Sequence, residues 1–391
     1  MIVPHAERLA GIQEYFFSRK LREVARLRAE GKAVVNLGIG SPDLPPSKET
    51  IAALSAAAYD EANHGYQPYH GTDLLRSEMA AWYQRVYGVE LDPDAQVLPL
   101  LGSKEGIMHI SMAFLNAGDQ VLLPDPGYPA YAVATHLAGA EPLPYDLDEA
   151  HGWLPDLQKL EATDTARVKL MWVNYPHMPT GALASVHDLA RVVGFARSRR
   201  ILICHDNPYS LVLNPEPPLS IFGVQGAFEN CIELNSLSKS YNMAGWRVGM
   251  VVGESDYLQT ILTFKSNMDS GMFFPVQAAA VVALRNSEEW HTQQNEIYRC
   301  RRKLSCEVMS LLGCTFEAVR PGLFVWGRAP EHMQNIESFL DELLVKAGVF
   351  LTPGSIFGKN GERYIRASIC VTEEFIQQAI DQIIAFLEVK R

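Results

Sequence analysis

Residues 235–249 read NSLSKSYNMAGWRVG and overlap the end of the apolar run CIELN at residues 231–235. Lys239 stands among three serines, and Arg247 follows eight residues later, at the start of a second apolar run. A solvated loop accounts for the serines, but it does not account for a tryptophan and an arginine so close to that second run. The stretch therefore raises the question of what the segments around it form.

Short apolar runs alternate with segments of helical period through the middle of the chain. The segment SVHDLARVVGFARSRR at residues 185–200, for example, has apolar residues three and four positions apart. Such alternation predicts a mostly parallel sheet covered by helices on both faces, the α/β class. The apolar runs are QVLLP (120–124), VKLMWV (168–173), ILICH (201–205), CIELN (231–235) and RVGMVVG (247–253).

The two ends of the chain have a different pattern. Residues 14–31 predict a charged amphipathic helix that ends at Gly31, and a short strand VVNLG follows at residues 34–38. The C-terminal third lacks the alternation of strand and helix, which suggests a second, smaller α+β domain. Its predicted elements are long helices at about 286–312 and 333–347 and short strands near 323–327 and 363–369.

The length of 391 residues also favours more than one domain. We expect a large domain at residues 46–280. We expect the small domain to be built from the N-terminal segment, residues 1–45, together with residues 281–391.

The composition excludes several classes of partner. A formal net charge of −11 argues against nucleic acid or an anionic membrane as the main partner. The six cysteines have no C-x-x-C spacing and are typical of thiols in a reducing compartment, so we expect no metal site from them. The N-terminal residues carry charges where a secretory signal is apolar, and no run of 18 apolar residues occurs. We therefore expect a cytoplasmic protein.

Polar side chains follow the predicted strands, at the edge where an open α/β sheet binds its ligands. Each has a plain alternative: Asp206 could cap a turn, Tyr128 could anchor a loop and Lys239 could be solvated. Together they supply a carboxylate, an amine, hydroxyls and aromatic rings that could converge on one ligand. The segments are GYPAY with Tyr128, NYPHMPTG (174–181), DNPY with Asp206 and Tyr209, and SLSK with Ser236, Ser238 and Lys239.

Residues Gly102, Ser103 and Lys104 form a glycine turn that opens a helix, and free N–H groups at a helix start bind anions, phosphate above all. The alternative is a plain helix cap by Ser103. Arg247 would be a second anion clamp, because a guanidinium suits phosphate. The turn is not a Walker loop, and LGIGSPD (37–43) lacks the third glycine of a dinucleotide fingerprint.

These stretches resemble the fold-type I pyridoxal 5'-phosphate (PLP) enzymes of the class I/II aminotransferases. The resemblance runs from about residue 10 to about residue 388, and the subgroup it is most similar to is the LL-diaminopimelate aminotransferase-like one. It implies a PLP-binding large domain with a mostly parallel sheet between helices. The motifs, in the order and spacing of the family, are LGIGSPDLPP, HGYQPYHGTDLLR, LGSKEGIMH, PDPGYPAY, NYPHMPTG, HDNPYS, SLSKSYNMAGWRVG and YIRASI.

The resemblance implies a role for each of these residues. Lys239 would hold the cofactor as a Schiff base and later carry the proton, Asp206 would pair with the pyridinium nitrogen, and Tyr209 would bond the phenolate oxygen. PLP is an electron sink, which needs a protonated ring nitrogen, and the lysine must be neutral to attack. The remaining implied contacts are Tyr128 and Asn174 on the cofactor; Gly102, Ser103, Lys104, Ser236, Ser238, Arg247 and a partner subunit's Tyr66 around the phosphate; and Arg366, Gly40, Tyr15 and Asn174 on the substrate.

One position departs from the family. Where its members usually have N-P-T-G, with an asparagine that donates to the phenolate oxygen, this chain has Met178. Either that donor is lost, or Asn174 or His177 partly replaces it. A lost donor would raise the pKa of the lysine-bound cofactor. The alternative is that Met178 only packs against the ring.

We therefore expect a PLP-dependent aminotransferase of amino-acid metabolism, which moves an amino group between an L-amino acid and a 2-oxo acid by a ping-pong cycle. A shared phosphate site would make it a homodimer. A PLP-dependent lyase or decarboxylase on the same fold is the alternative, and a PLP-binding regulator a more distant one. No motif identifies a second arginine for acidic substrates. The aromatic residues of 14–20 and 265–274, among them Phe16, Phe273 and Phe274, could line the side-chain pocket or belong to the core or an interface.

Overall fold

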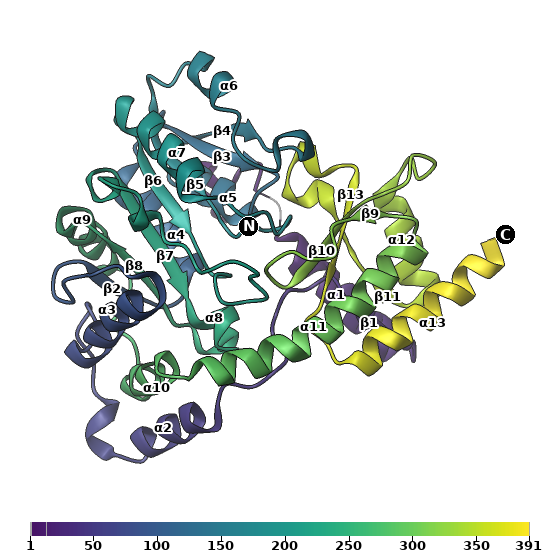
Figure 1. The fold of residues 1–391 in the computed structure, drawn as a ribbon, viewed down its shortest axis with the longest axis horizontal. Coiled ribbons are helices and arrows are strands. Elements are labelled where there is room, and N and C mark those ends of the chain that lie inside the picture. The colour runs from purple at the N-terminus through teal and green to yellow at the C-terminus, as the bar shows by residue number, and fades with distance from the viewer. Residues whose placement is uncertain (1, 13, 391) are drawn as a thin grey trace.

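The computed structural model describes residues 2–12 and 14–390 and has a seven-stranded sheet at its centre (Figure 1). Six strands run in one direction and β8 runs against them, pairing with β2 on one side and β7 on the other. The strand order is β2 (Val97–Leu100), β8 (Gly249–Gly253), β7 (Cys231–Ser236), β6 (Leu202–Asp206), β5 (Val168–Val173), β3 (Gln120–Asp125) and β4 (Glu141–Asp146). The predicted mostly parallel sheet is confirmed.

Helices cover both faces of this sheet because successive side chains of a buried strand point to opposite sides. In β5, Leu170 and Trp172 pack toward α4, α5 and α9, whereas Met171 and Val173 pack toward α3, α7 and α10. These helices are α3 (Asp73–Tyr87), α4 (Ser103–Phe114), α5 (Pro129–Leu137), α7 (Val186–Ser198), α9 (Ser255–Lys265) and α10 (Phe274–Leu284); nearby lie α2 (Lys48–Ala58), α6 (Leu157–Ala162) and α8 (Leu237–Ser240).

A smaller antiparallel sheet lies on the other side of the molecule with its own apolar core. Its order is β12 (Thr352–Pro353), β13 (Tyr364–Ser368), β10 (Phe324–Arg328) and β9 (Thr315–Phe316). The helices α11 (Glu288–Leu311), α12 (Ile336–Ala347) and α13 (Glu373–Lys390) pack against it. The second α+β unit expected from the sequence is therefore present.

The N-terminal segment packs with this smaller unit. Strand β1 (Val35–Asn36) pairs in parallel with β11 (Val349–Phe350), and α1 (Phe16–Ala29) contributes Val24 and Leu27 to a cluster with Leu344. The domain boundaries at residues 45/46 and 280/281 stay a prediction. The 3₁₀ helices are Glu7–Leu9, Glu61–His64, Glu149–His151, Ile221–Gly223, Ala227–Glu229, Ala244–Trp246, Gly354–Phe357 and Lys359–Gly361.

Two strands of the large sheet, β2 and β4, were not expected from the sequence. β4 reads EPLPYD, and its two prolines remove donors that a central strand needs, so it takes the edge of the sheet. Among residues 2–12 and 14–390, no helix has the length and apolar character to cross a membrane.

Candidate active site

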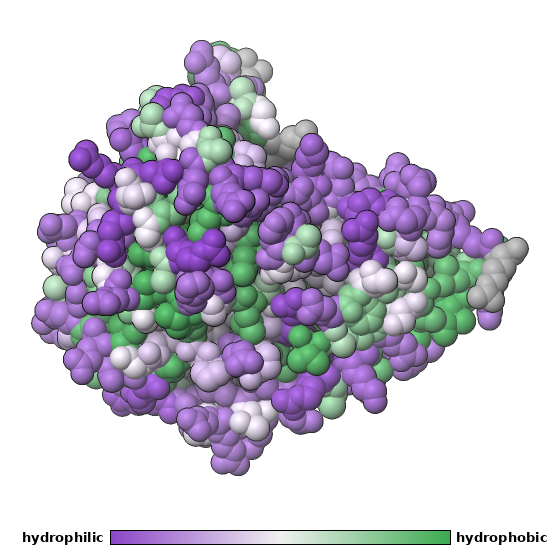
Figure 2. All heavy atoms as spheres, turned by 45° about the horizontal axis from the view of Figure 1, so that its top comes forward, coloured by the Kyte–Doolittle hydropathy of each residue, from purple (hydrophilic) through white to green (hydrophobic). Residues whose placement is uncertain are grey.

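A cavity of about 840 Å³ lies where the carboxyl ends of β5, β6 and β7 face α1 and the small antiparallel sheet. Figure 2 shows one face of the molecule, which is largely hydrophilic with separate groups of hydrophobic residues. The cavity is lined by nearly all the residues predicted for a site: Tyr15, Gly40, Ser103, Lys104, Tyr128, Asn174, Asp206, Tyr209, Ser236, Ser238, Lys239, Arg247 and Arg366. Gly102 directly precedes Ser103 in the chain but is not among the lining residues.

Lys239 projects into this cavity from the short helix α8. The hydroxyl of Ser236 caps that helix by accepting a hydrogen bond from Ser238 N at 3.1 Å. The ammonium of Lys239 donates to Gly40 O at 2.6 Å. Burial lowers the pKa of Lys239, and the positive charges of Arg366 and Arg247 act in the same direction. The site thus makes the neutral amine, which is the nucleophilic form, easier to reach than in an exposed lysine.

Asp206 ends strand β6, and its two carboxylate oxygens differ. Oδ2 accepts a hydrogen bond from Tyr131 OH at 2.7 Å, whereas Oδ1 is buried and has no hydrogen-bond partner in the described part of the chain. Burial raises the pKa of Asp206 to about 6. A buried carboxylate oxygen beside a cavity fits a positively charged N–H group of a bound molecule.

The turn at Gly102 forms a cradle with Arg247. Gly102 has a φ of 91°, and a Cβ there would overlap the guanidinium of Arg247, so only glycine allows this approach. Lys104 lies with its ammonium 4.4 Å from the centre of the Tyr15 ring, and burial together with the charge of Arg247 lowers the pKa of Lys104. Two cations and the free N–H groups of helix α4 suit a phosphate.

Arg366 lies on β13 at the opposite wall and is only 4% exposed. Its Nη2 donates to Gly38 O at 2.7 Å, its Nη1 lies 3.6 Å from Met178 Sδ, and its Nε is buried with no partner among the described residues. Burial lowers the pKa of Arg366 to about 10. Three rings surround the guanidinium, those of Phe17, Phe324 and Phe357, at 5.3, 4.0 and 4.6 Å. This arrangement leaves a buried cation available to an anionic ligand.

The loop that carries Met178 is held by Asn174. The amide of Asn174 donates to Asp206 O at 2.6 Å and accepts from Met178 N at 2.7 Å, so it fixes the loop to the end of β6. His177 bonds Thr180 and does not line the cavity, and burial lowers its pKa to about 3. The side chain that faces Arg366 is the thioether of Met178.

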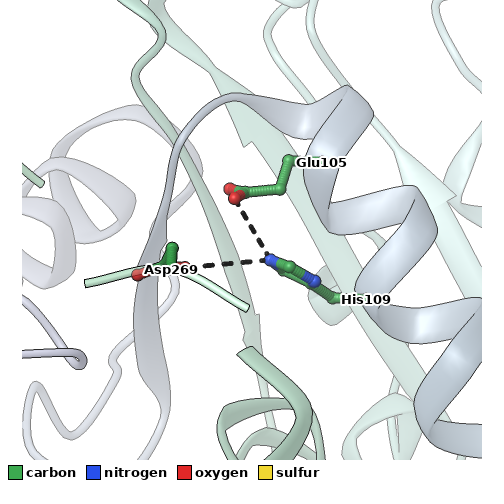
Figure 3. Close-up of side chains that lie close together, drawn as sticks. All are labelled: Glu105, His109 and Asp269. Carbon is green, nitrogen blue, oxygen red and sulfur yellow. Dashed lines mark ion pairs between the residues drawn. The ribbon is translucent and has the colours of Figure 1, made fainter. Parts of the chain in front are cut away.

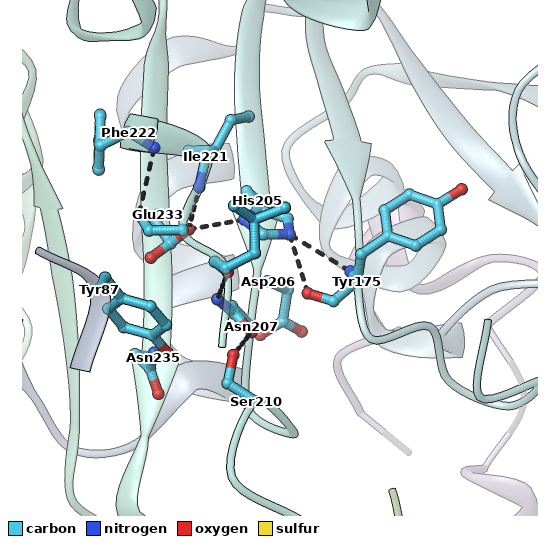
Figure 4. Close-up of polar contacts among 12 residues, drawn as sticks. Tyr87, Tyr175, His205, Asp206, Asn207, Ser210, Ile221, Phe222, Glu233 and Asn235 are labelled. Atoms are coloured by element: carbon cyan, nitrogen blue, oxygen red, sulfur yellow. Dashed lines mark hydrogen bonds and ion pairs between the residues drawn. The ribbon is translucent and has the colours of Figure 1, made fainter. Parts of the chain in front are cut away.

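A buried polar network that sequence reasoning missed supports the ends of β6 and β7 (Figure 4). Glu233 accepts hydrogen bonds from Tyr83 OH at 2.9 Å and Ile221 N at 2.9 Å, and lies 2.7 Å from His205 Nδ1. His205 Nε2 lies 3.1 Å from Tyr175 O, in the Met178 loop. The available signal was a histidine and a glutamate inside the apolar runs ILICH and CIELN, where polar residues need partners.

A second missed network lies beside the Gly102 turn (Figure 3). His109 Nε2 lies 3.3 Å from Glu105 and 4.0 Å from Asp269, and Glu105 accepts from Leu101 N at 2.7 Å, next to Gly102. These three side chains are of types that could hold a metal ion. However, the ammonium of the buried Lys265, 3.0 Å from Asp269, already supplies positive charge there.

Several predicted residues lie away from the cavity. Tyr66 is 92% exposed and does not line it, and Phe273 is exposed at the start of α10. Phe16 packs against the apolar clusters around α1, and Phe274 is half-buried. From the aromatic stretch at the N-terminus, Tyr15 and Phe17 reach the cavity.

Residues 32–383 match the sequence profile of the family "Aminotransferase class I and II". The chain belongs to this family. It is similar to the LL-diaminopimelate aminotransferases of Dehalococcoides mccartyi (strain CBDB1), 40% identical over 97% of this chain and 98% of that one, and of Moorella thermoacetica, 40% identical over 97% of each. Among solved structures, substrate-bound BacF from Bacillus subtilis is 33% identical, with a TM-score of 0.93 over 97% of each chain. N-succinyldiaminopimelate aminotransferase from Mycobacterium tuberculosis is 26% identical, with a TM-score of 0.90 over 97% and 99%.

This aminotransferase is PLP-dependent, as its family is, and its substrates are an amino acid and a 2-oxo acid. The predicted family and its LL-diaminopimelate aminotransferase-like subgroup are confirmed, and transamination is favoured over the lyase and regulator alternatives. The cavity fits the cofactor, because the orphaned Asp206 Oδ1, the Gly102–Arg247 cradle and the amine of Lys239 match its ring nitrogen, phosphate and aldehyde.

Proposed function

We propose that transamination takes place in this cavity, with Lys239 as the residue that bonds the cofactor and then moves the substrate's α-proton. The observation that carries the proposal is a buried amine with a lowered pKa, in one cavity with an orphaned carboxylate oxygen, the buried Arg366 and the exposed Arg247. When bound, PLP withdraws electrons from the Cα of the substrate, which makes its proton acidic.

Each remaining residue has a positioning role in this proposal. With the cofactor bound, Asp206 would hold a proton on the ring nitrogen, Tyr209 would bond the phenolate oxygen and Tyr128 would pack against the ring. Arg366 binds the substrate α-carboxylate through its fork of N–H donors. The phosphate would be held by the Gly102 turn with Ser103 and Lys104, and by Ser236, Ser238 and Arg247. Ser236 also caps α8, so Ser238 has the freer hydroxyl.

The same residues serve both halves of the reaction, because donor and acceptor share the α-carboxylate and the carbon atom that carries the amino or oxo group. Lys239 Nζ takes the proton from Cα in the first half and returns one to Cα in the second. Gly40 O, 2.6 Å from Nζ, keeps the amine on the substrate side of the cavity. The aromatic wall around Arg366 excludes water from the carboxylate clamp.

The test is a panel of amino-acid donors with 2-oxoglutarate or pyruvate as acceptor, followed by the cofactor's absorbance and by product analysis. We expect the unmodified enzyme to show ping-pong kinetics with at least one donor. We expect the Lys239→Ala variant to show no turnover with any donor. Turnover by Lys239→Ala comparable to the unmodified enzyme would disprove the role of Lys239.

We further propose that the enzyme is a homodimer in which Tyr66 reaches the phosphate of the partner subunit. Support comes from exposed apolar side chains on two segments, residues 51–74 and 265–273. These segments contact each other, because Lys265 Nζ donates a hydrogen bond to Tyr69 O at 2.7 Å. Such a patch suits a second copy of the chain. Its members are Ile51, Tyr59, Tyr66, Tyr69, Leu74, Met268 and Phe273. Light scattering during gel filtration tests the mass, and a monomer would contradict the proposal.

A cytoplasmic location is also proposed. All six cysteines are free thiols, which suits a reducing compartment. Cell fractionation with an antibody tests it, and recovery outside the cytoplasm would contradict it.

A further inference from the structure

His205 and Glu233 are partners in register on β6 and β7, and both side chains are 0% exposed. Glu233 Oε2 lies 2.7 Å from His205 Nδ1. The same carboxylate accepts from Ile221 N and from Tyr83 OH, each at 2.9 Å. Because an ionised carboxylate can only accept hydrogen bonds, the proton of the contact with the ring sits on Nδ1. The pair therefore fixes the imidazole and leaves Nε2 as the atom whose protonation can vary.

Nε2 of His205 faces both backbone groups of one residue, Tyr175 (Figure 4). It lies 3.3 Å from Tyr175 N and 3.1 Å from Tyr175 O. A neutral imidazole accepts from the N–H group through Nε2, whereas an imidazolium donates from Nε2 to the carbonyl oxygen. The ring therefore holds the backbone of Tyr175 in either protonation state.

Tyr175 belongs to the loop that reaches the proposed carboxylate clamp. Its neighbour Asn174 donates to Asp206 O at 2.6 Å and accepts from Met178 N at 2.7 Å. Met178 Sδ lies 3.6 Å from Arg366 Nη1, and the side chains of Asn174 and Met178 both line the cavity. The imidazole contact thus holds the backbone from which both of these side chains extend.

We infer that His205 is a positioning residue for the substrate's α-carboxylate, because it holds the loop at residues 174–178 against Arg366. The inference rests on the proposed function, which takes Arg366 as the carboxylate clamp. His205 is not among the lining residues of the cavity, so it acts through the backbone of Tyr175. Lys239 lies on α8, outside this loop. A displaced loop therefore weakens carboxylate binding more than it slows the proton transfer.

Two amide side chains separate the two contacts of His205. The amide of asparagine reaches about as far as Nδ1, so His205→Asn can still donate to Glu233 but is too short to reach Tyr175. The amide of glutamine reaches about as far as Nε2, so His205→Gln can bond Tyr175 but leaves Glu233 without one of its donors. A purely structural role predicts that stability and substrate binding fall together, whereas a positioning role predicts that they separate.

The KM of the amino donor is the first readout. With the donor that the unmodified enzyme turns over fastest, His205→Asn should raise KM at least about tenfold and His205→Gln less than about threefold, with smaller changes in kcat. In urea, His205→Gln should unfold at the lower concentration, because a bond to a charged acceptor is worth more than one between neutral groups. An unchanged KM in His205→Asn overturns the inference, and so does an equal rise in both variants.

Hydrogen exchange of the PLP-loaded proteins tests the loop without turnover. The amides of residues 175–178 should exchange at least about tenfold faster in His205→Asn than in the unmodified protein, and at an unchanged rate in His205→Gln. Helix α12, in the small unit, is the internal reference and should exchange equally in all three proteins. Unchanged loop exchange in His205→Asn, or faster loop exchange in His205→Gln, contradicts the inference.

The two readouts also separate this inference from the proposed function. Should the unmodified enzyme turn over no donor, that result counts against the proposed function, and hydrogen exchange decides the inference. Should His205→Asn not fold, His205→Gln decides it: a protected loop with a nearly unchanged KM supports the inference. A loop that exchanges faster, or a KM raised about tenfold, in His205→Gln overturns it.

Discussion

Replacement of Asp206 by asparagine should stabilise the cofactor-free protein while it impairs the enzyme. Burial raises the pKa of Asp206 from its ordinary value of 3.8 to about 6, because the ionised carboxylate is desolvated and its Oδ1 lacks a partner. Asparagine has nearly the same shape, carries no charge and can still accept the hydrogen bond from Tyr131 through its carbonyl oxygen.

The magnitude follows from proton linkage. Because the folded pKa is higher than the unfolded one, the folded protein binds this proton more tightly, and its stability falls as the pH rises from about 4 to about 6. The full difference between 3.8 and about 6 corresponds to about 3 kcal/mol, which is reached near pH 8. At pH 5 roughly half of it is present. The stability advantage of Asp206→Asn over the unmodified chain should therefore grow by about 1.4 kcal/mol from pH 5 to pH 8. At pH 8 the full advantage should raise the Tm by about 4 °C.

The assay is urea and thermal unfolding of both proteins without PLP, at pH 5 and pH 8, with the holoenzymes assayed for turnover in parallel. Asp269→Asn is the matched control, because it removes the partner of buried Lys265 and should lower the unfolding free energy by about 3 kcal/mol or more. If Asp206→Asn is no more stable than the unmodified protein at pH 8, or if its advantage does not grow with pH, Asp206 is not an uncompensated buried charge.

Substitutions at three further positions test the cofactor contacts. Lys239→Ala should remove the covalent adduct that borohydride reduction and mass spectrometry detect; an adduct of unchanged yield would place the linkage elsewhere. Arg247→Ala should raise the Kd of PLP by about 10- to 100-fold, and Arg247→Lys by less, because lysine keeps the charge but loses the fork; equal Kd values in all three proteins would exclude a phosphate contact. Met178→Asn should lower, by about one pH unit, the pKa at which the bound cofactor's absorbance changes; an unchanged pKa would mean that Met178 only packs there.

The sequence predicts where the site lies in the fold better than it predicts which distant segments contact each other around it. Parallel strands end at one edge of a sheet, so Asp206 and Lys239, each placed just after an apolar run, had to come close together. The Gly102 turn could also be predicted, because a glycine before a helix tolerates a positive φ. The first N–H groups of the helix that follows are free to bind an anion. Local patterns of this kind depend on a few neighbouring residues, and the sequence displays them directly.

The contacts between distant segments could not be predicted in the same way. Nothing near Gly38 or Gly40 in the chain indicates that Arg366 and Lys239 bond their carbonyls, because those pairs are brought together by the packing of β1 on β11 and of α1 on the small unit. Likewise, the side chains of His205 and Glu233 meet only because β6 and β7 are neighbours in register. Pairing across a sheet is set by the whole fold, and an apolar run does not specify it.

The burial that prepares the cavity residues for function also lowers the stability of the cofactor-free protein. Desolvation lowers the pKa of Lys239 and Arg366 and raises that of Asp206, so at neutral pH each ionised group costs folding free energy in the cofactor-free protein. Those costs are offset when a phosphate, a ring N–H and a carboxylate enter, because each supplies the missing opposite charge or hydrogen bond. The chain therefore keeps destabilising residues at positions where its ligands complete them. A buried lysine that costs folding free energy is retained where a ligand needs it. Lys239, at the end of a buried strand, therefore indicates the site of the chemistry more specifically than a surface charge does.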